Sequence, residues 1–574
     1  EIKLGISPEK IIQNTEISNL KKIIGLQTGQ VYKQEGKWPL RYGKLLILTD
    51  QDEDGSHIKG LVFNLFLTLW PSLYYMEGFL NSMLTPIVKC KKGKKERLFY
   101  SLPDYEKFKE GNGGWNSKYY KGLGTSTAKE SKDYFQNMKL VTYVNPEPEE
   151  RQFIDLAFAK EEGCADRRKE WLSHYQKADT LNYSEMKVSI GDFVNKDLKH
   201  FSNSDNIRSI PSMVDGLKPS QRKVLFGAFK RNLTKTEIKV AQLAGFVSEH
   251  TGYHHGEASL QGTIVNLAQN FVGSNNINLL EPLGQFGTRI GGGKDAAQPR
   301  YIFTKLCPHT LKIFNNLDND LYKYNYDDST KVEPEYYVPV LPMVLINGAQ
   351  GIGTGWSTDV PSFNPVALVE NMKLYMEGKE MKELVPFYNG FQGKIKKDKQ
   401  GKTYISKGTY VVSDSKIIIT ELPVGMWTDK YKEFLETLVI DSKKPNKKQI
   451  LRYYNSYCTD TKVQFELILS NEMIEKLEEM DWKLGYTKLE KQLKLVSTLN
   501  TTNMVLYDSN NQIKKYTTPE QILAEFCDTR LEFYTKRKDH LIQLLKKEIN
   551  MFEIKIRFIN MFIEDKIKII RKSK

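Results

Sequence analysis

The sequence predicts a multidomain protein of mixed α/β and α+β class. A chain of 574 residues is too long to fold around one hydrophobic core, so several domains are expected. The chain up to about residue 135 alternates between strand-like and helix-like segments. Short helices are predicted from about Met186, and strands and turns after Val338. These changes predict domains at 1–145, 186–330 and 331–510, a charged linker at 146–185 and a helical arm at 511–574.

The α/β pattern of the first domain begins with a predicted strand at Leu45–Leu48. This short apolar run is typical of strands that are buried on both faces. A buried helix over 58–74 and further strands near Leu84–Val88 are expected to follow. Later in this domain, the glycines of Tyr119–Ser126 allow a ligand to approach the backbone closely, and Lys121 offers a positive charge to DNA.

Three aspartates, Asp50, Asp52 and Asp54, follow the predicted strand at every second position. On an extended backbone this spacing places their carboxylates on one side, at the strand end where α/β sheets place their sites. Converging carboxylates repel one another unless a cation lies between them, and oxygen ligands suit Mg²⁺. An EF-hand loop would need glutamate at its twelfth position, which here is Leu61. We therefore predict a Mg²⁺ site, with a solvated acidic turn as the alternative.

The second domain is predicted to contain one helix that starts at Pro219 and another over Ser259–Phe271. The first of these carries Arg222 and Lys223 beside apolar residues, and Lys218 precedes it. A basic face next to an apolar face is typical of a helix that enters a DNA groove. An ordinary amphipathic surface helix would show the same pattern.

Arg300 directly precedes Tyr301, downstream of the glycine-rich segment Gly284–Gly293. A tyrosine phenol, with a pKa of about 10, is a poor nucleophile unless it is assisted. A neighbouring guanidinium can bind phosphate oxygens with two hydrogen bonds and stabilise the charge that develops on them. The pair alone also fits a packed tyrosine beside a surface arginine, but the acidic segment upstream favours phosphate chemistry.

The third domain is predicted to contain a strand at Val340–Asn347, closed by the glycine-rich turn Gly348–Trp356. Within this turn, Ile352 stands between two glycines. A hydrophobic side chain on a turn can wedge between base steps and kink a duplex. A buried loop residue is the alternative interpretation.

The last segment has apolar residues every three or four positions within a lysine-rich stretch: Leu541, Leu545, Ile549, Phe552, Ile556, Ile559 and Ile563. This spacing predicts an amphipathic helix with a seam like that of a coiled coil. Because the sequence stops inside this pattern, we expect the chain to be a fragment.

The amino-acid composition limits the classes of partner that the protein can have. The net charge of +14, from 84 basic and 70 acidic residues, suits a nucleic acid, although an acidic membrane surface would also fit. The five cysteines form no C-x-x-C pair, which predicts reduced intracellular thiols. The longest apolar stretch, Leu61–Trp70, is too short to span a bilayer, so no membrane partner is expected.

Seven motifs occur in order: D-x-D-x-D-G, Y-K-G-L-G-T, I-P-S-M-V-D-G-L-K-P-S-Q-R-K-V-L, Y-H-H-G-E, Q-F-G-T-R, P-R-Y-I-F-T and N-G-A-Q-G-I-G-T-G-W-S-T. Together they closely resemble the DNA-cleavage core of eukaryotic type IIA DNA topoisomerases over nearly the whole chain. The metal and tyrosine motifs share one chain, which resembles the eukaryotic arrangement and not that of bacterial gyrase. The resemblance implies a Toprim domain at 1–145, a winged-helix domain at 186–330, a tower domain at 331–510 and the start of a coiled coil at 511–574.

The resemblance also implies roles for single residues. Tyr301 would be the nucleophile, with Arg300 binding the phosphate beside it. His255 and Arg208 would touch the scissile phosphate, and Ile352 would intercalate and bend the DNA. From the sequence alone His255 could equally be structural, whereas a zinc site is disfavoured because further ligands at suitable spacing are lacking.

The family implies a nuclear homodimer that cleaves and reseals double-stranded DNA through a transient 5′-phosphotyrosyl bond, with Mg²⁺ as cofactor. ATP would act only through a domain that this sequence lacks. The family's E-G-D-S-A motif, whose glutamate binds metal, is also absent from the sequence. Two rival functions remain: a DNA-bending architectural protein without cleavage, and a metal-dependent nuclease that uses the acidic segment.

Overall fold

The computed structural model of the chain contains two compact units, each with its own hydrophobic core. The first comprises Glu1–Ser209 and Ile352–Ser357, and the second comprises Ile210–Gly351 and Thr358–Lys574. The structure describes residues 8–33, 39–120, 122–144, 150–183, 185–327, 330–398, 401, 403–413, 416–440, 450–469, 480–481, 485–564 and 566–567.

A mixed sheet in the order β1-β2-β6-β7 forms the centre of the first unit. Its strands are β1 (Leu45–Ile47), β2 (Leu80–Met83), β6 (Leu140–Val144) and β7 (Lys187–Ser189). β1 pairs parallel with β2, β2 antiparallel with β6, and β6 parallel with β7. Because β1 lies at the edge, Leu48 just after it is 45% exposed, and the predicted burial on both faces is wrong.

The helix after β1 begins earlier than its apolar pattern predicts. It is α3 (Glu53–Leu69), followed by the short α4 (Pro71–Tyr74). The break falls at Pro71, because proline has no N–H to donate within a continuous helix. The early start places part of the acidic segment inside α3, with consequences for the predicted metal site.

The remaining elements of the first unit surround this sheet. A second, antiparallel sheet has the order β4-β3-β5. The bounds are β3 (Val88–Lys92), β4 (Lys95–Phe99), β5 (Asn116–Tyr119), α1 (Pro8–Gln13), α2 (Thr15–Ile24), α5 (Leu102–Gly111), η1 (Leu123–Thr125), α6 (Ala128–Gln136), α7 (Arg151–Phe158), α8 (Cys164–Ser173), α9 (Ile190–Phe193), the π-helical turn η3 (Val194–Leu198) and α10 (Lys199–Ser209).

The segment predicted as a linker is largely part of the first unit. Its described residues include α7 and α8, and Ile154 and Phe158 of α7 lie in the core. Residues 186–209, predicted to open the second domain, also belong here, since β7 completes the sheet. The high charge of the segment concealed its few apolar residues, which are spaced to face one side of a helix.

The second unit opens with three packed helices, α11 (Pro219–Lys230), α12 (Val240–Thr251) and α13 (Glu257–Ala268). The predicted helix start at Pro219 is confirmed, and the helix predicted over 259–271 is α13. The short strand β8 (Ile238–Lys239) pairs antiparallel with β9 (Phe303–Thr304) beside them. Further elements are α14 (Thr310–Ile313), η4 (Asn316–Leu321), β10 (Tyr324–Asp327), β11 (Thr330–Pro334), α15 (Met343–Asn347), β12 (Ala349–Ile352), β13 (Ser357–Val360) and α16 (Pro365–Met376).

The strand predicted at Val340–Asn347 is wrong, because Met343–Asn347 forms α15. The residues from Met343 to Ile346 are all buried, so the run shows neither the alternation of a strand nor the periodicity of a surface helix. A short apolar run of this kind does not distinguish the two structures, and here the tertiary packing selects the helix.

The predicted change to strands after this point is confirmed. Two antiparallel sheets have the orders β14-β15-β22 and β16-β17-β19-β18. The bounds are β14 (Lys394–Lys397), β15 (Thr403–Lys407), β16 (Thr409–Ser413), β17 (Lys416–Glu421), α17 (Thr428–Glu436), β18 (Tyr453–Ser456), β19 (Phe465–Ile468), β20 (Met480–Asp481), β21 (Tyr486–Thr487), α19 (Lys488–Gln492), β22 (Val496–Asn500), β23 (Met504–Tyr507) and β24 (Ile513–Tyr516).

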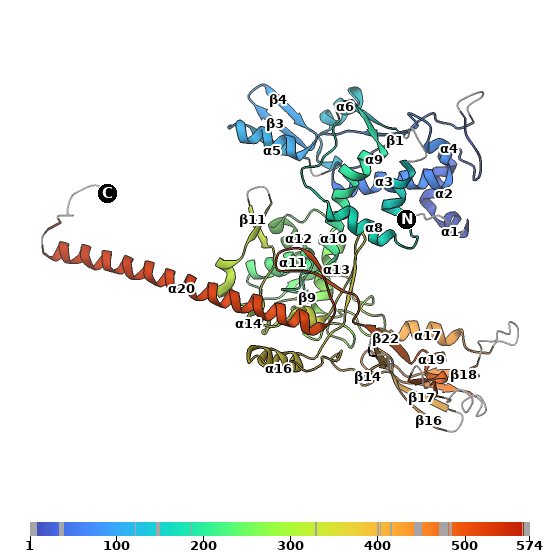
Figure 1. The fold of residues 1–574 in the computed structure, drawn as a ribbon, viewed down its shortest axis with the longest axis vertical. Helices are drawn as coiled ribbons and strands as arrows, with labels where there is room; N and C mark the ends of the chain where they lie inside the picture. Colours follow the sequence, from blue (N-terminus) through green and yellow to red (C-terminus); the bar gives the residue numbers. More distant parts are fainter. Residues whose placement is uncertain are drawn as a thin grey trace. The chain divides into compact units, whose positions relative to one another are not determined.

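The predicted C-terminal helix is α20, a continuous helix of 45 residues over Pro519–Ile563 (Figure 1). Its first part is packed on the second unit, where Phe526 and Arg530 are buried. Along its last part the predicted apolar seam is exposed, as at Leu545 and Ile559. No helix in the described part of the chain is both long enough and apolar enough to cross a membrane.

Candidate functional site

The acidic segment lies at the start of α3. Asp52 is the N-cap: its backbone is extended, and its Oδ1 accepts a hydrogen bond of 2.7 Å from the backbone N–H of Gly55. Asp54 therefore lies in the first helical turn, and the predicted extended arrangement of all three aspartates is wrong. Aspartate is favoured at both places, since it caps free backbone N–H groups and its charge complements the helix dipole.

Asp50 contacts the glycine-containing run that the sequence singled out. Its Oδ1 accepts a hydrogen bond of 2.6 Å from the backbone N–H of Leu123. Gly122 has a φ of 133°, and a Cβ atom there would lie only 3.0 Å from Asp50 Oδ2. Glycine thus permits both the backbone angle and the close approach. Lys121, predicted to contact DNA from this run, lies outside the described residues.

Arg208 is brought to the acidic segment by α10. Its Nη1 and Nη2 donate to the two carboxylate oxygens of Asp54 at 3.1 and 2.9 Å. Burial opposes the charged guanidinium, but the hydrogen bonds and charge of Asp54 outweigh it and raise the pKa of Arg208. The sequence predicted both residues but not their pairing, which joins positions 154 residues apart.

The donor set of this segment fits Mg²⁺ only in part. The described residues contain no group of three or more His, Cys, Asp or Glu side chains arranged to hold a metal. Both carboxylate oxygens of Asp54 already accept hydrogen bonds from Arg208. Asp50 and Asp52 remain as oxygen donors, and Mg²⁺ is commonly held by one or two carboxylates together with water and phosphate oxygens.

Tyr301 is held at the surface by buried neighbours. Its side chain is 66% exposed, whereas Ile302 is 2% exposed and lies in the core. The carbonyls of Pro299 and Ile302 accept hydrogen bonds from Ala241 and Val240, at the start of α12. The backbone on both sides of the phenol is therefore fixed while the hydroxyl faces solvent.

Arg300 lies against the ring of this tyrosine. The guanidinium carbon is 4.9 Å from the centre of the Tyr301 ring. The predicted pairing of a guanidinium with an accessible phenol is thus present in the structure. A phosphate at the phenol oxygen would be within the field of this cation.

His255 is exposed and follows the other end of α12. That helix ends at Gly252 in the left-handed conformation, and the His255 ring packs edge-on against buried Tyr253 at 5.4 Å. The twelve residues of α12 span about 18 Å. The residues on either side of Tyr301, Pro299 and Ile302, are bonded to the start of this helix, and His255 follows its last turn.

Ile352 is 84% exposed at the end of β12, which forms a two-stranded hairpin with β13. The alternative of a buried loop residue is therefore wrong. A large apolar side chain with this exposure is available to a partner such as the base steps of a duplex.

Two of the cations predicted to bind DNA are engaged inside the second unit. Arg222 is buried, and its guanidinium donates to fully buried Asp215 at 2.7 and 3.0 Å, so its predicted DNA contact is wrong. Lys223 donates to Glu333 at 3.0 Å and to the carbonyl of Thr251. A buried carboxylate needs a counter-charge, and these residues of α11 supply it.

Lys218 differs from them. Burial alone lowers the pKa of Lys218, and no carboxylate in the described part of the chain raises it. A bound phosphate would supply a counter-charge to this lysine. We expect Lys218→Ala to weaken duplex binding roughly tenfold and to reduce the salt dependence of log K by about one unit, equally for all sequences.

Titrations of binding against salt, read by fluorescence anisotropy, would measure this effect. Lys379→Ala is the matched control, because it removes the same charge from a lysine already paired with Glu377 at 2.7 Å. An unchanged salt dependence for Lys218→Ala would exclude the phosphate contact.

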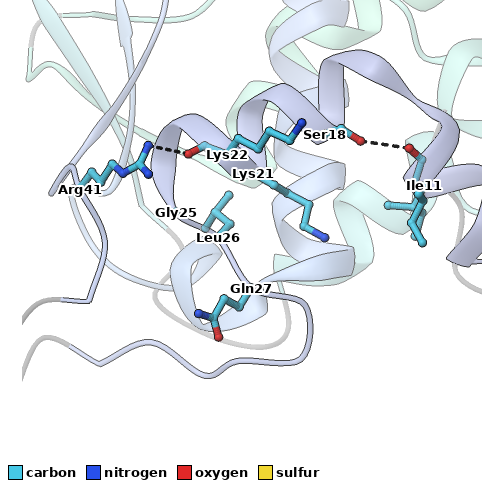
Figure 2. Close-up of a pocket in the computed structure, with 9 residues that line it drawn as sticks. Ile11, Ser18, Lys21, Lys22, Gly25, Leu26, Gln27 and Arg41 are labelled. Atoms are coloured by element: carbon cyan, nitrogen blue, oxygen red, sulfur yellow. Dashed lines mark hydrogen bonds between the residues drawn. The ribbon is translucent and has the colours of Figure 1, made fainter.

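A separate, open pocket lies in the first unit between α2 and the segment around Arg41 (Figure 2). Two of its cations have partners: Arg41 donates to the carbonyl of Lys22 at 2.7 Å, and Lys21 donates to Thr28 at 2.8 Å. Among the residues that the structure describes, none of the site residues predicted from the sequence lines this pocket.

The chain is similar to known proteins over 99% of its length. The DNA gyrase/topoisomerase IV family matches residues 208–574, and the C-terminal associated domain of TOPRIM matches residues 83–206. DNA topoisomerase 2 of Arabidopsis thaliana is 47% identical over 581 residues, covering 99% of this chain and 38% of that protein. DNA topoisomerase 2-alpha of Rattus norvegicus is 46% identical over 587 residues, with the same coverage of both chains. The chain thus spans well under half the length of these curated relatives.

A solved structure is also similar. It is a crystal structure of the Plasmodium falciparum topoisomerase II DNA-binding, cleavage and re-ligation domain. The TM-score is 0.78 with 43% sequence identity, covering 100% of this chain and 77% of that chain. The likeness extends over both units of the molecule.

Proposed function

Because the chain belongs to the eukaryotic DNA topoisomerase II family, we propose that it binds, cleaves and re-ligates double-stranded DNA. The observation that carries this proposal is the exposed Tyr301 with the Arg300 guanidinium 4.9 Å from its ring. Within this family, an accessible phenol beside a guanidinium suits attack on a phosphodiester. The proposal makes the chain the cleavage core of a longer, ATP-dependent type II enzyme.

In the proposed reaction, the Tyr301 oxygen attacks the phosphorus and loses its proton. A phosphotyrosyl bond to the 5′ phosphate forms, the bond to the 3′ oxygen breaks, and that oxygen leaves as a 3′-hydroxyl. Arg300 binds the non-bridging oxygens and stabilises the charge that develops on them. Since the energy of the broken bond is kept in the phosphotyrosyl linkage, resealing needs no ATP.

Mg²⁺ is the proposed cofactor, with Asp50 and Asp52 as its protein ligands. When bound, the ion neutralises charge on the phosphate oxygens at the break. Arg208, fixed by Asp54, adds a cation to the same segment. In this proposal Asp54 orients Arg208 toward the phosphate and is not a metal ligand.

We further propose a homodimer whose active site combines two protomers. The residues flanking Tyr301 are bonded to the start of α12, whereas His255 follows its far end, and this separation supports the arrangement. The exposed apolar seam of α20, running from Leu545 to Ile563, supports pairing through a coiled coil. In terms of the family, the first unit would contain the Toprim domain, the second the winged-helix and tower domains, and the protein would act in the nucleus.

A covalent-complex assay tests the proposed function. The chain is incubated with end-labelled duplex and Mg²⁺, denatured, and separated by electrophoresis. Label that migrates with the protein is expected, and it should disappear when EDTA is present from the start. Cleavage without protein-linked DNA would favour a metal-dependent nuclease instead.

DNA bending by Ile352 is expected both for a topoisomerase and for the rival candidate, a DNA-bending architectural protein. We expect Ile352→Ala to reduce the bent fraction of a bound duplex roughly tenfold, because unstacking a base step costs a few kcal/mol that the isoleucine offsets. Energy transfer between dyes at the two duplex ends measures the bend. Val366→Ala, which alters a second exposed aliphatic residue, should leave it unchanged.

A further inference from the structure

The turn that follows Ile352 is held by two side chains of α10 in the first unit. The hydroxyl of Thr354 donates to Asp205 Oδ2 at 3.0 Å. The side-chain amide of Asn206 donates to the carbonyl of Thr354 at 3.1 Å. These bonds join positions 149 and 148 residues apart, so no local pattern in the sequence indicates them.

The turn also fits closely against its neighbours. Asn206 is buried, with 2% of its surface exposed, and a Cβ atom at Gly353 would overlap its Oδ1. A Cβ atom at Gly355 would lie 3.0 Å from the Cβ of Arg168 on α8. Both glycines are therefore required by the approach of this turn to α8 and α10, and the turn has little freedom to shift while these contacts last.

α10 is in turn fixed to α3, which carries part of the acidic segment. His57 of α3 stacks on Phe201 of α10, with ring centres 3.9 Å apart and an angle of 4° between the rings. Arg208 at the end of α10 is bonded to Asp54 at the start of α3. Asp205 and Asn206, which hold the turn, lie three and two positions before Arg208 on the same helix.

The π-helical turn η3 adds a further tie between these helices. It places Asp197 so that its two oxygens accept from Ser56 at 2.7 Å and from Lys59 at 3.1 Å. Lys59 is buried, so this ion pair cannot be exchanged for water without leaving a buried charge. The pair α3–α10 therefore acts as one rigid support.

We propose that Asp205 and Asn206 are positioning residues that hold the Thr354 turn and thereby fix Ile352 in the orientation needed to enter DNA. This inference rests on the proposed role of Ile352. α10 then orients both Arg208, which is proposed to bind the phosphate, and Ile352, which is proposed to bend the DNA. The position of the bend is therefore fixed relative to the acidic segment. Neither positioning residue needs to touch DNA.

The experiment compares Thr354→Val with Thr354→Ser in the complete chain. Valine removes the hydroxyl that donates to Asp205 at nearly constant volume, whereas serine keeps it. We expect Thr354→Val to lower the bent fraction at saturating protein about tenfold, while duplex affinity and melting temperature change little. Thr354→Ser should bend DNA as the wild type does. Asp205→Ala, which removes the acceptor from the other side, should match Thr354→Val.

The outcomes separate the two proposals. If Ile352→Ala loses bending but Thr354→Val and Asp205→Ala bend normally, the positioning role is wrong and the role of Ile352 stands. If Ile352→Ala itself bends normally, the role of Ile352 is wrong. If Thr354→Ser loses bending as Thr354→Val does, the hydroxyl does not hold the turn and the positioning role is likewise excluded.

Discussion

Replacement of Tyr301 with phenylalanine is expected to abolish the covalent protein–DNA adduct, a decrease of roughly 10⁴-fold or more, as for loss of other enzymatic nucleophiles. The change removes only the attacking oxygen. The ring against Arg300 remains, and because the side chain is 66% exposed, folding should be unaffected. Affinity for duplex DNA should therefore stay within about twofold, since no phosphate-binding cation is lost.

The measurement is the denaturing gel for protein-linked DNA, with anisotropy for binding. Tyr326→Phe serves as the control, because Tyr326 is 67% exposed in the same unit but has no proposed role. An adduct at the wild-type level in Tyr301→Phe would show that another residue is the nucleophile. Strand cleavage that persists without any adduct would instead point to a nuclease.

Asp318→Ala is expected to destabilise the second unit by about 3–5 kcal/mol, the usual effect of removing one partner of a buried ion pair. Asp318 is fully buried in η4 and accepts hydrogen bonds from two arginines of α20, Arg530 at 2.7 Å and Arg537 at 2.6 and 2.7 Å. Arg530 also donates to the carbonyl of Val338. Without the carboxylate, a buried guanidinium loses its counter-charge where α20 leaves the unit.

Thermal unfolding and hydrogen exchange along α20 measure this loss, with exchange expected to increase first around Arg530. Asp320→Ala is the control, two residues away on the same element. The Asp320 side chain is mostly exposed and lies 3.7 Å from Nε2 of His540, so removing it should change the stability by no more than about 0.5 kcal/mol. Equal effects of the two substitutions would contradict the role of the buried pair.

Local patterns predicted those features that depend on a few neighbouring residues. Pro219 marked the start of α11, and the apolar spacing from Leu541 marked α20. The sequence predicted the Arg300–Tyr301 pairing but not the 66% exposure of Tyr301, which the structure shows. The mixed class and the change to strands in the last third of the chain were predicted by composition and periodicity.

The failures arose where the tertiary packing, and not the local sequence pattern, sets the environment of a residue. Arginine is a residue type that often contacts DNA, but the Arg222 guanidinium is buried and paired with the fully buried Asp215. The run at Met343 could form a strand or a helix, and packing selected α15. The charged segment after residue 145 was assigned to a linker because its few buried residues, such as Ile154, have partners elsewhere in the first unit.

By itself, the sequence identified the family and predicted a tyrosine nucleophile and oxygen ligands at the acidic segment, because these predictions depend on which side chains stand next to one another in short motifs. Only the tertiary structure decided which of those side chains are available. It paired Asp54 with Arg208, buried Arg222, exposed Ile352 and joined Thr354 to Asp205 and Asn206. The physical reason is that burial and ion pairing depend on the folded packing. The Asp54–Arg208 and Thr354–Asp205 bonds, for example, join residues 154 and 149 positions apart, which no local periodicity encodes.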